Sequence, residues 1–208
     1  MTILPPTGLS LPLRRRRAPG GFSLIELLVT IAIVAIIATL TIPSFRTLLQ
    51  NNKLTANTND FLASLQTARG EAIKRNANVT LCTTLDATVA LPQCAASTAA
   101  TSWIVFQDIN PPTGQPANVA ALIETHPNSV AGQSIRANNS GRLSFTATGF
   151  PYTTTPAMTG IAFCDARGVT ASSGNVVLIS ATGHGTGYSR TTPYTAVQAL
   201  AASTLTCP

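Results

Sequence analysis

The chain has 208 residues, of which 45% are hydrophobic and only 10% are charged. Its formal net charge of +6 includes four consecutive arginines at residues 14–17, and without them nine basic side chains face seven acidic ones. The remaining excess is too small to indicate a nucleic-acid-binding protein, and the apolar content excludes a disordered chain. The length suits one ordinary domain plus an anchoring segment.

A basic leader and a long apolar run open the chain. We expect residues 1–21 to form the leader, held in the cytoplasm by the positive-inside rule. The residues that carry this orientation signal are Arg14, Arg15, Arg16 and Arg17. Phe22–Ile42 follows, and a helix of that length is ~31 Å long, enough to cross the hydrocarbon core of a membrane. Pro43 marks either a kink or the membrane exit.

One acidic side chain, Glu26, interrupts the apolar run near its start. A carboxylate inside a membrane-length segment is costly unless it serves a function, and an acid that snorkels to the cytoplasmic interface is the alternative. The run Gly21–Glu26, GFSLIE, resembles the processing site of type IV prepilins. The resemblance implies that a prepilin peptidase cuts between Gly21 and Phe22 and methylates the new N-terminal amine of Phe22.

The implied cut precedes the apolar segment, whereas a secretory signal is usually cut after it. The segment would then remain as the anchor of the mature chain, and an uncleaved single-pass anchor is the alternative. After cleavage, the amine of Phe22 and the carboxylate of Glu26, in the same or a neighbouring subunit, attract strongly in apolar surroundings. We therefore expect Glu26 to set the register of an incoming subunit.

The helical pattern continues after Pro43 as an amphipathic stretch. Residues that would lie on one core-facing side of a helix recur at spacings of three and four: Leu54, Thr58, Phe61, Leu65, Ala68 and Ala72. This periodicity predicts that one helix runs from about Phe22 to about Arg75 and ends near Asn76–Asn78. Its second half is expected to pack on a folded domain.

Strand-like runs separated by turn residues follow the helix. The runs are Val79–Thr84, Ser102–Gln107, Val119–Thr125, Arg142–Thr146, Gly160–Cys164 and Asn175–Ser180. They predict an α+β fold in which a long N-terminal helix packs on an antiparallel β-sheet domain of about six or seven strands.

Four cysteines lie beyond the export signal, which indicates two disulfides in an oxidising compartment. Three pairings are possible. We favour Cys82 with Cys94, which closes a short loop, and Cys164 with Cys207, which ties down the C-terminal tail. The spacing of Cys and His residues fits no zinc site, and the sequence predicts no metal or other cofactor.

A second resemblance covers the amphipathic helix and the first strands. The runs ARGEAIKRN at residues 68–76, VTLC at 79–82 and WIVF at 103–106 resemble the GspH/FimT group of minor pseudopilins, with Gly70 where serine is usual. The resemblance implies a long helix packed on a β domain and assembly with other pilins into a filament or tip complex. It also implies an inner-membrane assembly platform and a prepilin peptidase/N-methyltransferase as partners.

Some members of that group are thought to contact DNA through a Gly-Arg element on a late strand. Residues 181–186 match its place, but His184 stands where arginine is expected, and a neutral imidazole is a poor phosphate contact. A glycine-rich turn between two strands is the simpler interpretation. The arginines that could still gather into a DNA-binding patch are Arg136, Arg142, Arg167 and Arg190. Neither a nucleophile elbow nor a phosphate-binding glycine motif occurs, so we predict no catalytic residues and no enzyme.

The sequence thus predicts a minor pilin or pseudopilin, with a major filament subunit and a pilus-associated DNA-binding protein as alternatives. Four segments are expected: a leader at 1–21, a transmembrane helix at 22–43, its amphipathic continuation at 44–78 and a β-rich domain at 79–208. The expected location is the bacterial inner membrane, single-pass, with the N-terminus cytoplasmic and the β domain periplasmic. The choice between a type IV pilus and a type II secretion system stays open.

Overall fold

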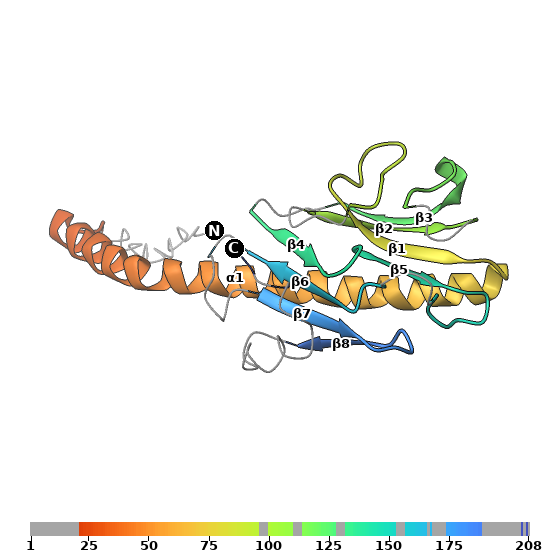
Figure 1. Cartoon of the computed structure of the whole chain (residues 1–208). Helices are drawn as coiled ribbons and strands as arrows, with labels where there is room; N and C mark the ends of the chain where they lie inside the picture. Colours follow the sequence, from red (N-terminus) through yellow and green to blue (C-terminus); the bar gives the residue numbers. More distant parts are fainter. Residues whose placement is uncertain are drawn as a thin grey trace, which may run out of the picture. The chain divides into compact units, whose positions relative to one another are not determined.

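The computed structural model describes residues 21–95, 100–109, 114–127, 132–152, 157–165, 167, 174–188, 205 and 207. The chain divides into two compact units between Phe45 and Arg46, and each is described by itself. The first unit holds the beginning of helix α1, and the second holds the rest of that helix and all the strands (Figure 1). The predicted leader, with Arg14–Arg17, lies outside the described residues.

Helix α1 runs over Leu24–Arg75, as the periodicity predicted, and contains Pro43. Its end is set by Asn76, which has a positive φ of 48°. The backbone N–H groups of Asn76 and Ala77 donate to the carbonyls of Ile73 and Ala72, both at 3.2 Å. This is the Schellman arrangement, in which a residue in the left-handed region satisfies the last free carbonyls of a helix.

Eight strands follow α1 in the described part of the chain, arranged in two antiparallel sheets. Sheet A has the order β3-β2-β1-β5 and is built from Leu122–His126, Ser102–Gln107, Val79–Thr84 and Arg142–Phe145. Sheet B has the order β4-β6-β7-β8 and is built from Ser134–Ala137, Gly160–Cys164, Gly174–Ile179 and Gly185–Tyr188. The α+β fold is as predicted.

The structure adds strands β4 and β8 to the six that the sequence indicated. Strand β4 has only four residues with one fully buried apolar side chain, Ile135, so its periodicity is too short to detect. Strand β8 begins with Gly-Thr-Gly, and glycine disfavours strands by propensity. The run predicted as a strand over Val119–Thr125 instead begins as the 3-10 helix η1, Val119–Ala121, before β3.

The main core lies between the second half of α1 and the inner faces of both sheets. All six residues of the predicted helix stripe are buried. Phe61 of α1 makes edge-to-face contacts with Trp103 of β2 at 5.7 Å and with Phe163 of β6 at 5.8 Å between ring centres. One aromatic side chain of the helix therefore packs on a ring from each sheet.

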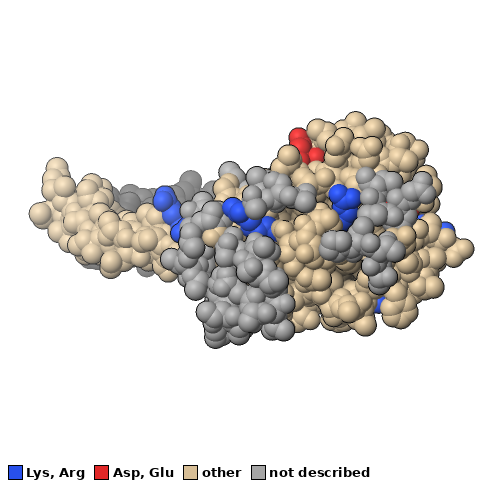
Figure 2. Space-filling model, in the orientation of Figure 1, with Lys and Arg blue, Asp and Glu red and all other residues tan. Residues whose placement is uncertain are grey.

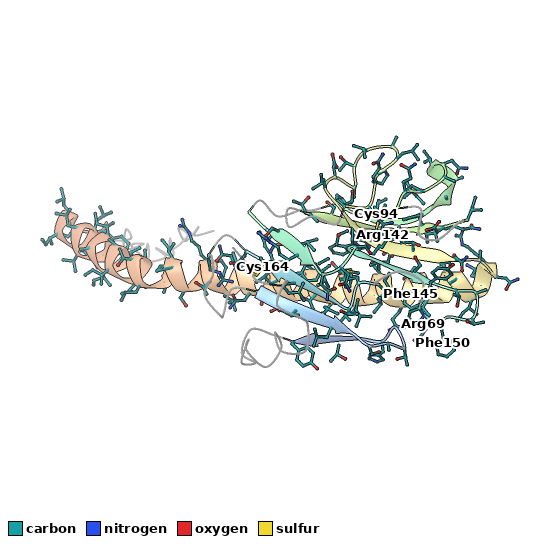
Figure 3. All side chains as sticks on the ribbon, in the orientation of Figure 1. Arg69, Cys94, Arg142, Phe145, Phe150 and Cys164 are labelled. Carbon is teal, nitrogen blue, oxygen red and sulfur yellow. A yellow bond between two sulfur atoms is a disulfide. The ribbon has the colours of Figure 1, made fainter. Side chains whose placement is uncertain are left out.

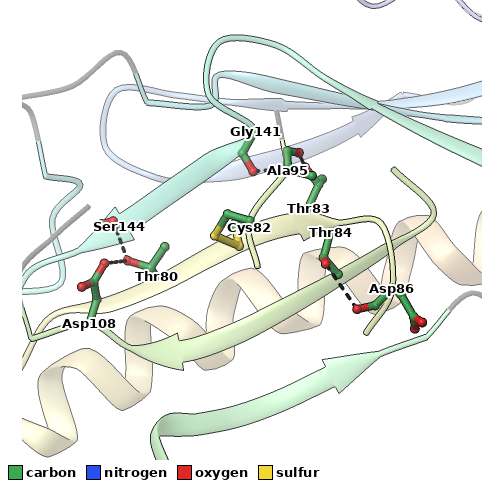
Figure 4. The surroundings of a disulfide bond; sticks show 10 residues. Thr80, Cys82, Thr83, Thr84, Asp86, Ala95, Asp108, Gly141 and Ser144 are labelled. Atoms are coloured by element: carbon green, nitrogen blue, oxygen red, sulfur yellow. Dashed lines mark hydrogen bonds between the residues drawn. A yellow bond between two sulfur atoms is a disulfide. The ribbon is translucent and has the colours of Figure 1, made fainter. Parts of the chain in front are cut away.

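Each sheet also has an outer face, and a disulfide holds a covering segment on it. On sheet A, the disulfide between Cys82 and Cys94 (Figure 4) holds the loop after β1. This loop buries Ala87 against Ile104 and Phe106. On sheet B, the bond between Cys164 and Cys207 holds the tail, which buries Leu205 against the outer residues of β6 and β7. Both pairs are those that the sequence favoured.

Candidate functional site

The predicted processing site lies immediately before the helix. Gly21, Phe22 and Ser23 have no regular secondary structure, and α1 begins at Leu24. Phe22 is 82% exposed, and no heavy atom lies within 4 Å of the position that a Cβ would take on Gly21. The bond between Gly21 and Phe22 therefore lies in exposed, non-helical backbone, which is the form in which a peptidase can bind a chain.

Glu26 lies exposed in the first turn of α1. Its position suits a carboxylate, because the first N–H groups of a helix have no partner within the helix and the helix dipole favours negative charge there. From Leu27 to Phe45 the helix carries no charged residue at all. Glu26 is thus the one acidic residue that directly precedes the uncharged stretch Leu27–Phe45.

That apolar surface is uncovered on all sides of the helix. Every large hydrophobic side chain from Phe22 to Phe45 is exposed by 47–82%. By length and composition α1 is able to cross a membrane, with a mean hydropathy of 2.6 over its most apolar window. A helix that is apolar all round is stable only when lipid or other protein surrounds it.

The hydroxyl groups within the apolar segment are satisfied by the helix itself. Thr30 donates to the carbonyl of Leu27 at 2.8 Å, and Thr39 donates to that of Ile36 at 2.7 Å. Thr41 likewise donates to a carbonyl of the preceding turn. These bonds lower the cost of placing the hydroxyls in apolar surroundings.

In the second unit, a series of polar contacts fastens α1 to the strand domain. Arg167 donates to the side chain of Asn51 at 3.0 Å, and Asn175 donates to Thr58 at 3.2 Å. The indole N–H of Trp103 donates to Ser64, also at 3.0 Å. These bonds satisfy polar groups that the helix would otherwise bury without partners, and they fix its register against both sheets.

Arg69 makes the contact that joins the two sheets near the end of α1. Its Nε donates to the carbonyl of Gly149 and one terminal nitrogen donates to that of Thr182, both at 2.7 Å. Gly149 lies in the turn after β5 of sheet A, and Thr182 lies in the turn between β7 and β8 of sheet B. The guanidinium also lies 5.8 Å from the ring centre of Phe145, and Figure 3 shows Arg69 and Phe145 near each other.

Two glycines allow the turns to approach Arg69 and its neighbours. Gly149 and Gly183 both have φ of +77°. A Cβ on Gly183 would lie 2.5 Å from the Phe145 ring, and one on Gly149 would lie 2.7 Å from Ile73. Arg69 belongs to the run ARGEAIKRN, but its role is not predictable from the sequence, because the two carbonyls that it binds lie 80 and 113 residues away.

The last turn of α1 carries an ion-pair group. Glu71 accepts hydrogen bonds from Arg75 at 2.6 Å and from Lys74 at 3.1 Å. These two bonds, that from Arg75 first, hold the pKa of the Glu71 carboxyl below its ordinary value. In the loop after β1, a hydrogen bond from Thr88 lowers the pKa of Asp86 in the same way.

The described arginines among those proposed from the sequence as DNA contacts lie on different elements. Arg136 is on β4 of sheet B and Arg142 is on β5 of sheet A. Arg167 forms an ion pair with Asp165, so its charge is already neutralised. Figure 2 shows Lys and Arg side chains in separate places on this face rather than in one continuous patch. Arg190 lies outside the described residues, and contact with DNA stays a prediction.

Residues 181–186, which were expected to form a glycine-rich turn, form a turn and the start of strand β8. Ser180 accepts a hydrogen bond from the backbone of His184, and β8 begins at Gly185. A shallow groove of about 340 Å³ beside this turn is lined by Thr159, Leu178, Ile179, Ser180, His184, Thr186 and Tyr188. Among the described residues, no group of three or more His, Cys, Asp and Glu side chains could hold a metal ion.

The long N-terminal helix and the antiparallel strand domain define a pilin-like protein. In agreement, the model of the prokaryotic N-terminal methylation motif matches residues 16–42. The chain belongs to the GspH family, because the family model described as type II transport protein GspH matches residues 57–183, more than half of the chain. This places it among the minor pilins and pseudopilins.

A solved structure shares the fold. A crystal structure of the type IV minor pilin FimU from Pseudomonas aeruginosa is 21% identical to this chain, with a TM-score of 0.50, and covers 67% of this chain and 91% of its own. A second crystal form of FimU is 18% identical, with a TM-score of 0.45, and covers 66% and 94%. No curated protein matches the chain.

Proposed function

We propose that this GspH-family chain is a minor filament subunit with a structural and assembly role, in priming or at the tip of the filament. The filament is a type IV pilus or the pseudopilus of a type II secretion system. The observation that carries this proposal is the exposed apolar helix with its single acid, Glu26. An apolar helix needs lipid or protein around it, and a carboxylate within such surroundings needs a partner. The partners are other pilins, the prepilin peptidase and an inner-membrane assembly platform.

The proposed sequence of events begins with membrane insertion. Arg14–Arg17 keep the leader, residues 1–21, in the cytoplasm, and residues 22–43 cross the inner membrane. Cleavage after Gly21 then gives Phe22 a free, methylated amine. Residues 44–78 continue the helix, and residues 79–208 fold in the periplasm, where an oxidising environment supports both disulfides.

Glu26 is the residue that we expect to align an incoming subunit. In an apolar filament core, a carboxylate and an ammonium group attract strongly, whereas either charge alone is heavily penalised. A subunit that places its Glu26 beside the amine of Phe22, its own or that of a neighbour, is therefore favoured over one shifted along the axis. Both residues lie within residues 16–42, the range that the model of the methylation motif matches.

The substitution Glu26→Leu tests this role. We expect the variant to insert into the membrane and to be cleaved, because the leader and the cleavage bond are unchanged, but to be absent from sheared filaments. Immunoblots of membrane and filament fractions measure both, and Glu26→Asp, which keeps the charge, serves as the control. Incorporation of Glu26→Leu at the wild-type level would contradict the proposal, and a count of subunits per filament would distinguish a minor from a major subunit.

A further inference from the structure

A short stretch of α1 lies between its charge-free apolar part and its attachment to the strand domain. Leu27–Phe45 is without charge and ~28 Å long as a helix, close to the thickness of a hydrocarbon core. The first buried side chain of the helix is Leu54. Between these limits, Arg46 and Lys53 are exposed, as are Leu48 and Leu49, by 53% and 43%.

The two cations lie on one side of the helix. They are seven residues apart, almost two turns, which places their side chains nearly in line and ~10.5 Å apart along the axis. At ~100° per residue, Leu49 lies next to this basic line and Leu48 lies on the opposite side of the helix, so exposed apolar surface is present on both sides at this level. Cations that directly follow an apolar helix are typical of the membrane–water boundary, where long basic side chains reach the interface.

Arg46 and Lys53 differ from Lys74, Arg75 and Arg167 in having no acidic partner. All seven acidic residues lie within the described ranges, and none of them forms an ion pair with Arg46 or Lys53. By contrast, Lys74 and Arg75 share Glu71, and Arg167 binds Asp165. Two positive charges are therefore left uncompensated at the point where the apolar helix ends.

We propose that Arg46 and Lys53 bind the phosphate groups of anionic phospholipids in the leaflet nearest the strand domain, with Leu48 and Leu49 in the interfacial layer. Charge complementarity and the direct continuity of this stretch with the apolar segment support lipid as the occupant. The contact holds the unassembled subunit at a defined depth and is exchanged for subunit contacts on assembly. The inference rests on the proposed membrane anchor.

Lipid binding by the full-length protein in neutral detergent tests the proposal. The protein is titrated with phosphatidylglycerol or with phosphatidylethanolamine, and bound lipid is counted by native mass spectrometry. We expect Arg46→Gln with Lys53→Gln to weaken phosphatidylglycerol binding by up to about five-fold for each cation removed, with no change for phosphatidylethanolamine. The arginines at 14–17 are present in every variant and contribute equally.

The matched control is Lys74→Gln with Arg75→Gln, which removes the same charge from the same helix where Glu71 is the partner. This variant should bind phosphatidylglycerol as the wild type does. Equal losses in both double variants would overturn the proposal in favour of general charge attraction. Unchanged lipid binding in Arg46→Gln/Lys53→Gln, with loss of cross-linking to other subunits, would overturn it in favour of a protein partner.

A second measurement separates this inference from the proposed anchor. Alkaline extraction of membranes reports whether the chain is embedded at all. Release of the wild type at alkaline pH would contradict the anchor itself. Retention of wild type and variants together with equal lipid binding would contradict only the role of Arg46 and Lys53.

Discussion

Arg69 illustrates how one side chain of the helix holds a turn from each sheet. Its two donors bind carbonyls of Gly149 and Thr182, and its charged group lies near the ring of Phe145. Hydrogen bonds from a charged donor are stronger than those between neutral groups. The ends of sheets A and B are therefore positioned by α1 as well as by their own strand pairing.

We expect Arg69→Met to lower the free energy of unfolding by about 1–3 kcal/mol, since the apolar stem is kept and both charged hydrogen bonds are lost. Urea unfolding of the detergent-solubilised protein measures this. Arg75→Met is the control: it removes a surface ion pair with Glu71 and should change stability by less than ~1 kcal/mol. Equal effects would show that Arg69 adds nothing beyond a surface contact.

Two glycines should respond in opposite directions to the same substitution. Gly70→Ala is expected to stabilise the protein by about 0.5–1 kcal/mol, because Gly70 lies inside α1 with open space where a Cβ would stand. Gly183→Ala should destabilise it by at least ~1–3 kcal/mol, because its φ is +77° and the Cβ would meet Phe145. Thermal unfolding of both variants checks the signs, and a shift of both in one direction would contradict this interpretation.

At the level of elements, both faces of each sheet pack against other parts of the chain. The inner faces pack on α1, and the outer faces are covered by the disulfide-bonded loop on sheet A and the disulfide-bonded tail on sheet B. Strand β8 can lie against α1 because Gly185 has no Cβ, which would lie 2.7 Å from the side chains of Leu62 and Leu65. The composition of that strand is thus explained by its contact with the helix.

Loss of the second disulfide should cost more stability than loss of the first. By loop-closure entropy, Cys82–Cys94, with a separation of 12 residues, contributes about 3 kcal/mol, and Cys164–Cys207, with a separation of 43, contributes about 4 kcal/mol. Double Cys→Ala variants of each pair, unfolded in urea, measure both values. The variant without Cys164–Cys207 should also bind a hydrophobic dye, because Leu205 would leave sheet B. A larger loss of stability in the variant without Cys82–Cys94 would contradict this role of the tail.

At the scale of the whole molecule, the chain combines two units with different solvent requirements. The described residues of the first unit are almost entirely exposed apolar helix, whereas the second has a core between α1 and two sheets. The family model covers most of the second unit, and the methylation motif lies in the first. The first unit thus exposes apolar surface on all sides in its described residues, whereas the second has a core of its own.

We therefore predict that residues 46–208, expressed in an oxidising compartment, fold without detergent into a soluble monomer with both disulfides. Size-exclusion chromatography and a single cooperative thermal transition would establish this. The full chain, as the control, should require detergent because of its exposed segment up to Phe45. Aggregation of the shorter chain would show that the strand domain depends on the apolar helix.

Features that depend on the local order of residues could be predicted from the amino-acid sequence. The apolar length of 22–42, the position of Glu26, the periodic stripe from Leu54 to Ala72 and six of the strands are all properties of neighbouring residues. The two disulfides were favoured among three pairings because each closes a loop that otherwise lacks support.

Other features depend on partners that are distant in the sequence and exist only in the folded chain. They are the division into two sheets, the strands β4 and β8, and the hydrogen bonds of Arg69, one of which spans 113 positions. Local propensity cannot predict these contacts. Gly185 packs against Leu62, and Arg69 reaches the carbonyl of Gly149, only after the chain has folded.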